Sequence, residues 1–311
     1  MSRPRSRAAD YAVYLVVRVV VCVIQALPLP AARRLADALA WLIYHADRRH
    51  RLVAHDNLRH AFPELAADDR RRDALVRAVY RHFCNLLMEM IHLPRALAPT
   101  TWRRFVALPC GRELVAALLS GRPLLFVTAH FGNWEMGGYT LGLLGIASSA
   151  IARRLDNPHL DRFLRRFRQR TGQEVLDKSG DFERIQGALE GGGVLATLGD
   201  QDAGQRGLYV DFFGRPASTH KAVALLALEY RAPMLVIGCP RLAGPLNYAV
   251  VLEDVILPEE YEGRRPDAVR ALTERFTAAL ERLVRRHPEQ YFWLHRRWKH
   301  QPAAKKGKTA A

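Results

Sequence analysis

The chain has 311 residues, of which 49% are hydrophobic, which is enough for the packed core of one large domain or two smaller ones. Lys and Arg number 47 against 31 Asp and Glu, and the resulting net charge of +16 favours anionic partners such as nucleic acid, an anionic membrane surface or acidic molecules. The four scattered cysteines form no C-x-x-C pair, which argues against a disulfide framework or a structural zinc site.

An apolar segment at residues 11–27 follows a basic N-terminus, and its only charge is Arg18. A bilayer-spanning helix needs roughly 20 apolar residues, so this segment is short. A basic flank without an A-x-A cleavage site disfavours a signal peptide. We therefore predict that residues 1–30 form a basic segment and membrane anchor, with a buried soluble helix as the alternative. The sequence leaves open whether the anchor spans the bilayer or lies in it.

The following third of the chain is predicted to be helical. Residues 31–44 are apolar and helical, 47–65 form a basic amphipathic stretch, and 68–92 form a helix that ends before Pro94.

Beyond residue 120, apolar runs alternate with helical stretches. Strands are predicted at 123–129, 147–152, 173–177, 192–198, 232–242 and 247–256. Helices are predicted at 134–144, 157–170, 182–189, 219–230 and 266–287. This alternation predicts an α/β fold with a central, mostly parallel sheet flanked by helices, spanning residues 31–300. The tail at 301–311 is predicted to be disordered and basic.

The stretch "TAHFGNWEMGG" places His130 just beyond the carboxyl end of a predicted buried strand, where α/β sheets bind ligands. Glu135 follows in the first turn of a predicted helix. If Glu135 held one ring nitrogen of His130, the other nitrogen would be free to accept a proton. A structural histidine beside a helix-start glutamate is the alternative that the pair alone favours.

Two further stretches carry charged or polar groups. Residues 152–172 contain Arg153 and Arg154 after a strand, and Asn157 before an arginine-rich helix. The arginines of this helix could form a solvent-exposed basic face, or they could bind phosphate or a membrane surface. Residues 198–222 contain Asp200, Gln201 and Asp202 after another strand. Two carboxylates at this spacing suit a divalent cation or polar contacts within a site. The stretch "LYVDFFG" reads as a loop, and Ser218 or Thr219 as the cap of a helix.

The last stretch, "YFWLHRRWKH" at 291–300, interleaves aromatic rings with cations. It suits a membrane interface, an RNA surface, or a strand that packs its rings inward and directs arginines at the site.

These four blocks occur in an order and spacing that resemble the bacterial lipid A biosynthesis (late) acyltransferases, within the H-x4-D/E lysophospholipid acyltransferase superfamily. The resemblance covers nearly the whole chain, including the apolar N-terminus and "AFPEL". It implies a glycerolipid acyltransferase-like fold with a helical N-terminal region that associates with the cytoplasmic face of the cell inner membrane.

The resemblance also implies an activity and its residues. Such enzymes move a fatty acyl chain from acyl carrier protein, or from coenzyme A, to a hydroxyl of a lipid A precursor, and relatives acylate mannosylated phosphatidylinositol. The catalytic pair falls on His130 and Glu135. The substrate-binding positions fall on Arg153 or Arg154, on Asn157 of the N-P dipeptide, and on Asp200 and Gln201. No metal, cofactor or nucleic acid is implied.

The residues agree with this chemistry. A hydroxyl needs a base when it attacks, and His130 can be that base, while backbone N–H groups or Arg153 could stabilise the oxyanion. The chain has no G-x-S-x-G elbow, so we predict direct transfer in a ternary complex. Two alternatives remain: a metal-dependent hydrolase using Asp200 and Asp202, and a non-catalytic basic module that binds membrane or nucleic acid.

Overall fold

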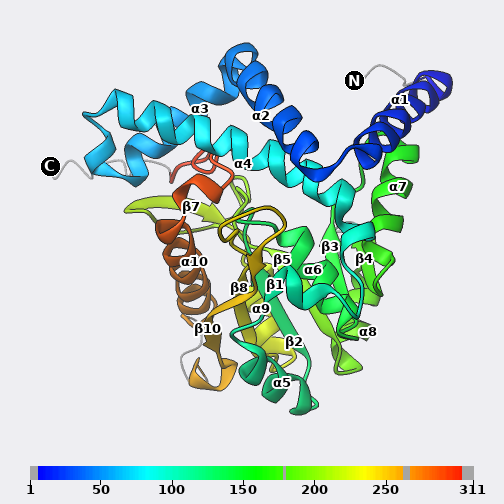
Figure 1. The fold of residues 1–311 in the computed structure, drawn as a ribbon. Coiled ribbons are helices and arrows are strands. Elements are labelled where there is room, and N and C mark those ends of the chain that lie inside the picture. The colour runs from blue at the N-terminus through cyan, green and yellow to red at the C-terminus, as the bar shows by residue number, and fades with distance from the viewer. Residues whose placement is uncertain (1–5, 178–179, 262–266, 303–311) are drawn as a thin grey trace, which may run out of the picture.

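A computed structural model describes residues 6–177, 180–261 and 267–302 of the chain (Figure 1). Residues 303–311 of the predicted tail, and residue 266 at the predicted start of the last helix, lie outside the described residues.

The first third of the chain is helical, as predicted, and forms one end of the molecule (Figure 1). Its helices are α1 (Arg7–Ala26), α2 (Leu29–Ala46), α3 (Arg48–Ala61) and α4 (Asp69–Ala96), with the short 3-10 helix η1 (Pro63–Leu65) after α3. The prediction that the fourth helix ends before Pro94 is wrong, because α4 continues through Pro94 to Ala96. Proline cannot donate a backbone hydrogen bond, and the burial of Leu93 and Leu97 beside it offsets the free-energy cost of this loss.

The predicted central sheet has six strands in the order β10-β8-β2-β5-β3-β4. Its strands are β2 (Leu124–Thr128), β3 (Ser148–Ala152), β4 (Gln173–Asp177), β5 (Val194–Leu198), β8 (Met234–Gly238) and β10 (Val251–Ile256). All neighbours pair in parallel except β10, which runs antiparallel to β8 at one edge. The mostly parallel sheet is thereby confirmed. A separate pair, β1 (Val106–Ala107) and β9 (Tyr248–Ala249), forms a short parallel ladder.

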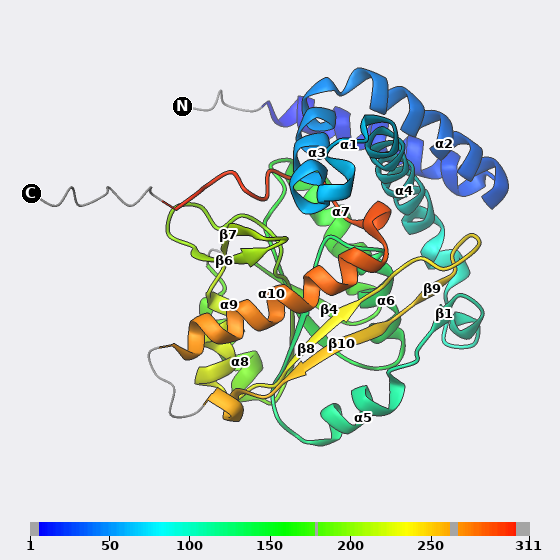
Figure 2. The ribbon, with the colours of Figure 1, turned by 90° about the vertical axis from the view of Figure 1, so that its left-hand side faces the viewer.

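Helices cover both faces of the sheet, so its central strand reads as an unbroken apolar run. On one face, Leu124 and Phe126 of β2 pack with Leu114 of α5 (Gly111–Leu119) and Leu141 of α6 (Trp134–Leu143). On the other face, Leu125 and Val127 join the main core with α8, α9 and α10, which lie in front of the sheet in Figure 2. These helices are α8 (Phe182–Glu190), α9 (Ala222–Glu229) and α10 (Ala268–Arg286). The remaining helix, α7 (Pro158–Gln169), contacts β4 and α6. Three 3-10 turns complete the described elements: η2 (Trp102–Arg104), η3 (Pro258–Tyr261) and η4 (Pro288–Gln290).

A β-hairpin replaces the loop predicted around "LYVDFFG". Strands β6 (Leu208–Phe212) and β7 (Arg215–Thr219) pair antiparallel, and Ser218 and Thr219 lie in β7 instead of capping a helix. Phe213 and Gly214 join the strands with φ angles of 56° and 73°. Consecutive positive φ angles are typical of two-residue hairpin turns, but Phe is an unusual residue at the first position, so the sequence carries no clear hairpin signal.

The apolar N-terminal helix α1 is long and apolar enough to cross a membrane, and only 11% of its apolar window is buried. One side of α1 packs on the protein: its backbone at Asp10 accepts a hydrogen bond from Asn157 at 2.8 Å, and Arg18 lies over the ring of Phe163 in α7. The other side exposes Val16, Val19, Val20 and Val23. We therefore find a helix that is docked along one side and uncovered along the other.

Candidate active site

His130 and Asp200 meet at the carboxyl ends of two neighbouring strands. His130 follows β2, Asp200 follows β5, and the parallel register aligns Thr128 with Leu198 at the ends of these strands. Nδ1 of His130 lies 2.9 Å from Oδ1 of Asp200, and the backbone N–H of His130 donates to Oδ2 at 2.9 Å. Asp200 is buried and thus fixes both the ring orientation and the backbone of His130.

The two side chains shift each other's pKa. Burial by itself lowers the pKa of His130, but attraction to the Asp200 carboxylate and the hydrogen bond to it outweigh burial, so the pKa is raised. Burial by itself raises the pKa of Asp200, but His130 and its hydrogen bonds hold that pKa below the ordinary value. The pair therefore combines an ionised carboxylate with a ring of increased basicity.

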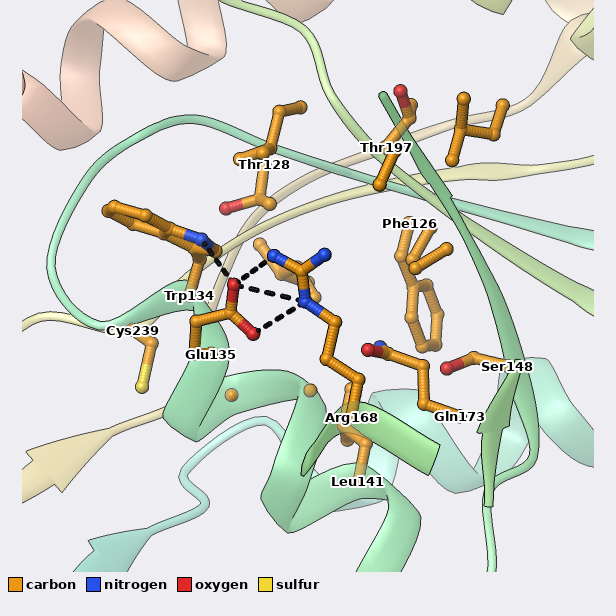
Figure 3. A pocket seen from close by; sticks show the side chains of 18 residues that line it. Phe126, Thr128, Trp134, Glu135, Leu141, Ser148, Arg168, Gln173, Thr197 and Cys239 are labelled. Atoms are coloured by element: carbon orange, nitrogen blue, oxygen red, sulfur yellow. Dashed lines mark hydrogen bonds and ion pairs between the residues drawn. The ribbon is translucent and has the colours of Figure 1, made fainter. Parts of the chain in front are cut away.

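Glu135 does not hold His130, which corrects the expected contact. Its carboxylate accepts hydrogen bonds from Arg168 of α7, with Nε 3.0 Å from Oε2, and from the indole Nε1 of Trp134 at 3.2 Å (Figure 3). Glu135 lies in the first turn of α6, and the register of β2 and β5 brings Asp200, not Glu135, to the ring of His130. The two carboxylates therefore have different partners: Asp200 pairs with His130, and Glu135 pairs with Arg168.

The second ring nitrogen of His130 faces polar and aromatic neighbours. Nε2 lies 3.5 Å from the amide nitrogen of Gln201. The ring centroids of Trp134 and Phe292 lie 5.1 Å and 6.0 Å from that of His130. Because Asp200 occupies Nδ1, Nε2 is the nitrogen available to accept a proton from a substrate.

A buried network behind the histidine holds the turn that carries it. His82 of α4 has its Nε2 3.1 Å from the carbonyl oxygen of Gly132, and burial first, then the charge of Arg241, lowers the pKa of His82 to about 3. A neutral ring can donate this bond. Gly132 has a φ of +59°, and a Cβ there would lie 2.0 Å from the carbonyl oxygen of Cys239. Only glycine fits this close approach.

The same network contains a fully buried carboxylate. Glu89 of α4 accepts hydrogen bonds from Arg241 and Tyr248. The backbone N–H of Arg241 donates to Gln290 at 2.7 Å, and the carbonyl of Gln290 accepts the N–H of Gly132 at 2.9 Å. The helical N-terminal region is thus connected to the His130 turn through a chain of hydrogen bonds.

A mostly apolar cavity of about 100 Å³ lies beside the Glu135–Arg168 pair (Figure 3). Phe126, Leu141, Ile151 and Leu198 contribute apolar walls from β2, α6, β3 and β5. Trp134 lines this cavity and also packs against His130, so one indole ring connects the cavity to the histidine. Its chemistry suits an alkyl chain with a polar group at one end.

The other predicted substrate residues lie apart from His130. Arg153 and Arg154 follow β3, which β5 separates from β2, and their exposed guanidinium groups pair with Asp156 and Asp177. Asn157 is buried and caps α7, accepting the N–H groups of His159 and Leu160 at 3.0 and 3.2 Å. Substrate contacts of these three residues stay predictions, whereas Asp200 and Gln201 do lie at the histidine.

The carboxylates of Asp200 and Asp202 contact different histidines: Asp200 contacts His130, and Asp202 contacts His300. Asp202 Oδ2 lies 2.7 Å from Nδ1 of His300, and its backbone N–H donates to Nε2 of His295 at 3.1 Å. Within residues 6–177, 180–261 and 267–302, no group of three or more His, Cys, Asp or Glu side chains is arranged to hold a metal ion. The geometry therefore offers no support for the hydrolase alternative.

Three residues of the site were not predicted from the sequence. Arg168 belongs to the arginine-rich helix, where only contact with α6 distinguishes it from its exposed neighbours. Asn133 is the N-cap of α6, accepting the N–H of Met136 at 2.9 Å, and a capping signal before a helix could have identified it. Trp134 links the two pairs, because it contacts both His130 and Glu135.

Comparison with known proteins supplies independent information. The family described as "Bacterial lipid A biosynthesis acyltransferase" matches residues 2–300. The chain is 27% identical to the lipid A biosynthesis lauroyltransferase of Escherichia coli K12, covering 89% of this chain and 88% of the relative. It is 25% identical to the lipid A biosynthesis palmitoleoyltransferase of the same strain, covering 89% and 87%.

A further relative matches part of the chain. The phosphatidylinositol mannoside acyltransferase of Mycobacterium tuberculosis H37Rv is 32% identical over 131 residues, which are 41% of this chain and 42% of the relative. The family match spans nearly the entire sequence, including the His130, Arg153, Asp200 and C-terminal blocks. The chain therefore belongs to the bacterial lipid A biosynthesis acyltransferase family.

Proposed function

We propose that this protein transfers a fatty acyl chain from a thioester donor, acyl carrier protein or coenzyme A, to a hydroxyl of a lipid A precursor or related glycolipid. The observation that carries the proposal is His130, oriented by Asp200 at Nδ1 and packed against Trp134, which lines an apolar cavity. The relatives are acyltransferases of glycolipids, which supports this substrate class.

In the proposed reaction, Nε2 of His130 takes the proton of the acceptor hydroxyl as its oxygen attacks the thioester carbonyl. The carbon–sulfur bond then breaks, and the leaving thiolate takes the proton from the imidazolium, so the products are an ester and a free thiol. Gln201 lies 3.5 Å from Nε2, where it can contact the same reacting groups. Direct transfer in a ternary complex requires no nucleophilic cysteine, and burial raises the pKa of the thiol of Cys239, the cysteine closest to the His130 turn.

We assign different roles to the two carboxylates. Asp200 is a positioning residue that acts through His130, whereas Glu135 holds Arg168 in the wall of the cavity. The cavity would receive the acyl chain, with the thioester beside His130. Arg153 and Arg154, which follow the cavity-lining Ala152, would contact the polar part of a substrate at the rim.

The protein is proposed to act at the cytoplasmic face of the cell inner membrane, with residues 1–30 as the anchor and 31–300 as the acyltransferase domain. The exposed valines of α1 and the exposed Trp41 and Leu42 of α2 support membrane association. The net charge of +16 suits an anionic leaflet, a phosphorylated acceptor and an acidic carrier protein.

The test is transfer by purified protein from radiolabelled acyl carrier protein or acyl coenzyme A to a phosphorylated glycolipid. We expect intersecting double-reciprocal plots, as a ternary complex requires, and loss of activity in a folded His130→Ala variant. Parallel double-reciprocal plots would indicate an acyl-enzyme intermediate instead. Full activity of the His130→Ala variant would show that His130 is not the general base.

Acylation of a phosphatidylinositol mannoside is a second candidate, favoured by the 32% identity to the mycobacterial relative. Presenting both acceptors to the same preparation separates the two candidates. Mass spectrometry of lipids from a deletion strain then identifies the missing acyl chain and its position.

A further inference from the structure

A hollow of about 370 Å³ lies between α3, β7 and the C-terminal segment. Figure 2 shows the C-terminal segment, in red, running between α3 and the β6–β7 hairpin. Three cations line the hollow: Arg215 at the start of β7, and Arg296 and Lys299 in the C-terminal segment. Neither the family's proposed acyl transfer nor the cavity beside Glu135 uses them.

These cations have no acidic partner among the residues that the structure describes. Some arginines elsewhere on the surface, such as Arg275 and Arg282, do pair with carboxylates. One acid, Asp56, reaches the hollow, and it lies 3.6 Å from Nδ1 of His60. Three neighbouring cations without such a partner repel one another, and an anion placed between them relieves this repulsion.

Part of the remaining wall is apolar. Leu52 and Val53 of α3 and the ring of Trp298 line the hollow. Leu52 is 57% exposed, so this wall is open to a ligand rather than filled by the protein. A site that combines cations with an exposed apolar wall suits a phosphate carried on a lipid better than a free, fully hydrated anion.

The hollow has a firm framework. Nδ2 of the buried Asn57 donates to the carbonyl oxygens of Trp293 and His295 at 2.7 and 2.8 Å and so fastens the C-terminal segment to α3. The indole Nε1 of Trp298 donates to the carbonyl of Arg215 at 3.3 Å. These bonds hold the backbones that carry the three cations in place before any ligand arrives.

The segment that carries two of the cations also contacts Gln201, which follows β5. Arg297, between Arg296 and Trp298, donates from its buried guanidinium to the carbonyl oxygens of Gln201 and Ser218, at 3.4 and 2.6 Å. Gln201 in turn lies 3.5 Å from Nε2 of His130. The segment that carries Arg296 and Lys299 is therefore linked to the reacting nitrogen through Arg297 and Gln201.

We infer that this hollow binds a phosphate group of the glycolipid acceptor and so positions the acceptor hydroxyl toward His130. The inference rests on the proposed function, because it identifies where the acceptor, as distinct from the acyl donor, is bound. It assigns Arg215, Arg296 and Lys299 to acceptor recognition and predicts that acceptors with a phosphate are preferred over the same lipids without one.

Kinetics of the variant R215A/R296A/K299A test the inference. Because each exposed ion pair contributes little to binding, we expect the KM for a phosphorylated glycolipid to rise only about tenfold in the triple variant. The KM for the acyl donor should stay unchanged. With the enzymatically dephosphorylated acceptor, wild type and variant should have equal KM values.

Two matched variants control for charge and geometry. R103A/R104A/R112A removes the same charge from exposed arginines in η2 and α5, none of which lines the hollow, and should keep the wild-type KM. R215K/R296K keeps the charge at the hollow and should recover most of the affinity. Thermal unfolding of each variant establishes that it is folded.

Three results would overturn the inference. An unchanged KM of the triple variant for the phosphorylated acceptor would show that the hollow does not bind the acceptor. A raised KM for acyl carrier protein alone would show that the hollow binds the donor instead. Weaker sedimentation with phosphatidylglycerol vesicles, without an acceptor effect, would assign it to bulk lipid phosphate.

Binding measured without catalysis separates this inference from the proposed function. Calorimetric titration with the phosphorylated glycolipid in neutral detergent micelles should show binding by wild type and weaker binding by the triple variant, even if no acyl transfer is detected. Equal affinity of both proteins in this titration contradicts the inference whatever the outcome of the transfer assay.

Discussion

Asp200 contacts His130 through both of its carboxylate oxygens, one 2.9 Å from Nδ1 of the ring and the other 2.9 Å from the backbone nitrogen. A single buried side chain thus sets the rotation of the ring, its tautomer and the position of its backbone. Removal of this carboxylate should change both the rate of the reaction and its dependence on pH.

We expect Asp200→Asn to lower kcat by about 10²–10⁴-fold, because the amide no longer favours the tautomer with Nε2 free and cannot stabilise the imidazolium. The pKa of His130 should also fall, since its attraction to Asp200 is lost, and the acid limb of the kcat/KM profile should move to lower pH. A variant that loses activity without this shift would indicate a purely structural role for Asp200.

The wild-type protein should lose activity as the pH falls. His130 accepts a proton only when neutral, and its pKa is raised above the ordinary value of 6.5 because the Asp200 carboxylate outweighs the effect of burial. The midpoint of the acid limb in kcat/KM, measured with a pH-stable acceptor, should therefore lie above pH 6.5. A midpoint below that value would contradict the geometry of the pair.

The Glu135–Arg168 pair makes a distinct prediction about stability. Both side chains are largely buried, so Glu135→Gln leaves an uncompensated guanidinium and should lower the free energy of unfolding by about 3 kcal/mol. The double variant Glu135→Gln/Arg168→Met removes both charges and should recover part of this loss. Chemical denaturation measures the cycle, and additive losses would show that the two side chains do not interact.

Gly132 should tolerate no side chain. A Cβ there would lie 2.0 Å from the Cys239 carbonyl oxygen, so Gly132→Ala should destabilise the protein by about 4 kcal/mol or prevent folding. Gly145 also has a positive φ, of +82°, but no atom lies within 4 Å of the place that a Cβ would take, so Gly145→Ala should cost only about 1–2 kcal/mol. Similar losses at both glycines would mean that backbone strain, not the close approach, dominates.

The uncovered side of α1 should govern membrane association. Val16→Lys/Val20→Lys places two charges on that side and should weaken flotation with anionic liposomes by about tenfold or more. Leu119→Lys, at an exposed position on α5, is the matched control and should float like wild type. Unimpaired flotation of the double variant would assign membrane contact to another surface.

Local sequence patterns predicted much of the fold. The alternation of apolar runs and helical stretches placed β2, β3, β4, β5, β8 and β10 and the flanking helices, because strand and helix periodicity are local properties of the chain. Patterns also located His130 and Asp200 at strand ends. The β6–β7 hairpin escaped prediction because its turn uses Phe213, which carries no turn signal.

The pairing of side chains was decided by tertiary structure. The sequence alone determined that His130 follows a buried strand, that Glu135 begins a helix and that a chain of this charge suits anionic partners. Only the parallel register of β2 and β5 brought Asp200 to His130 across 70 residues, and only the packing of α7 on α6 gave Glu135 its partner Arg168. Contacts between distant segments depend on how strands align and helices pack, and neither is encoded in any single stretch of sequence.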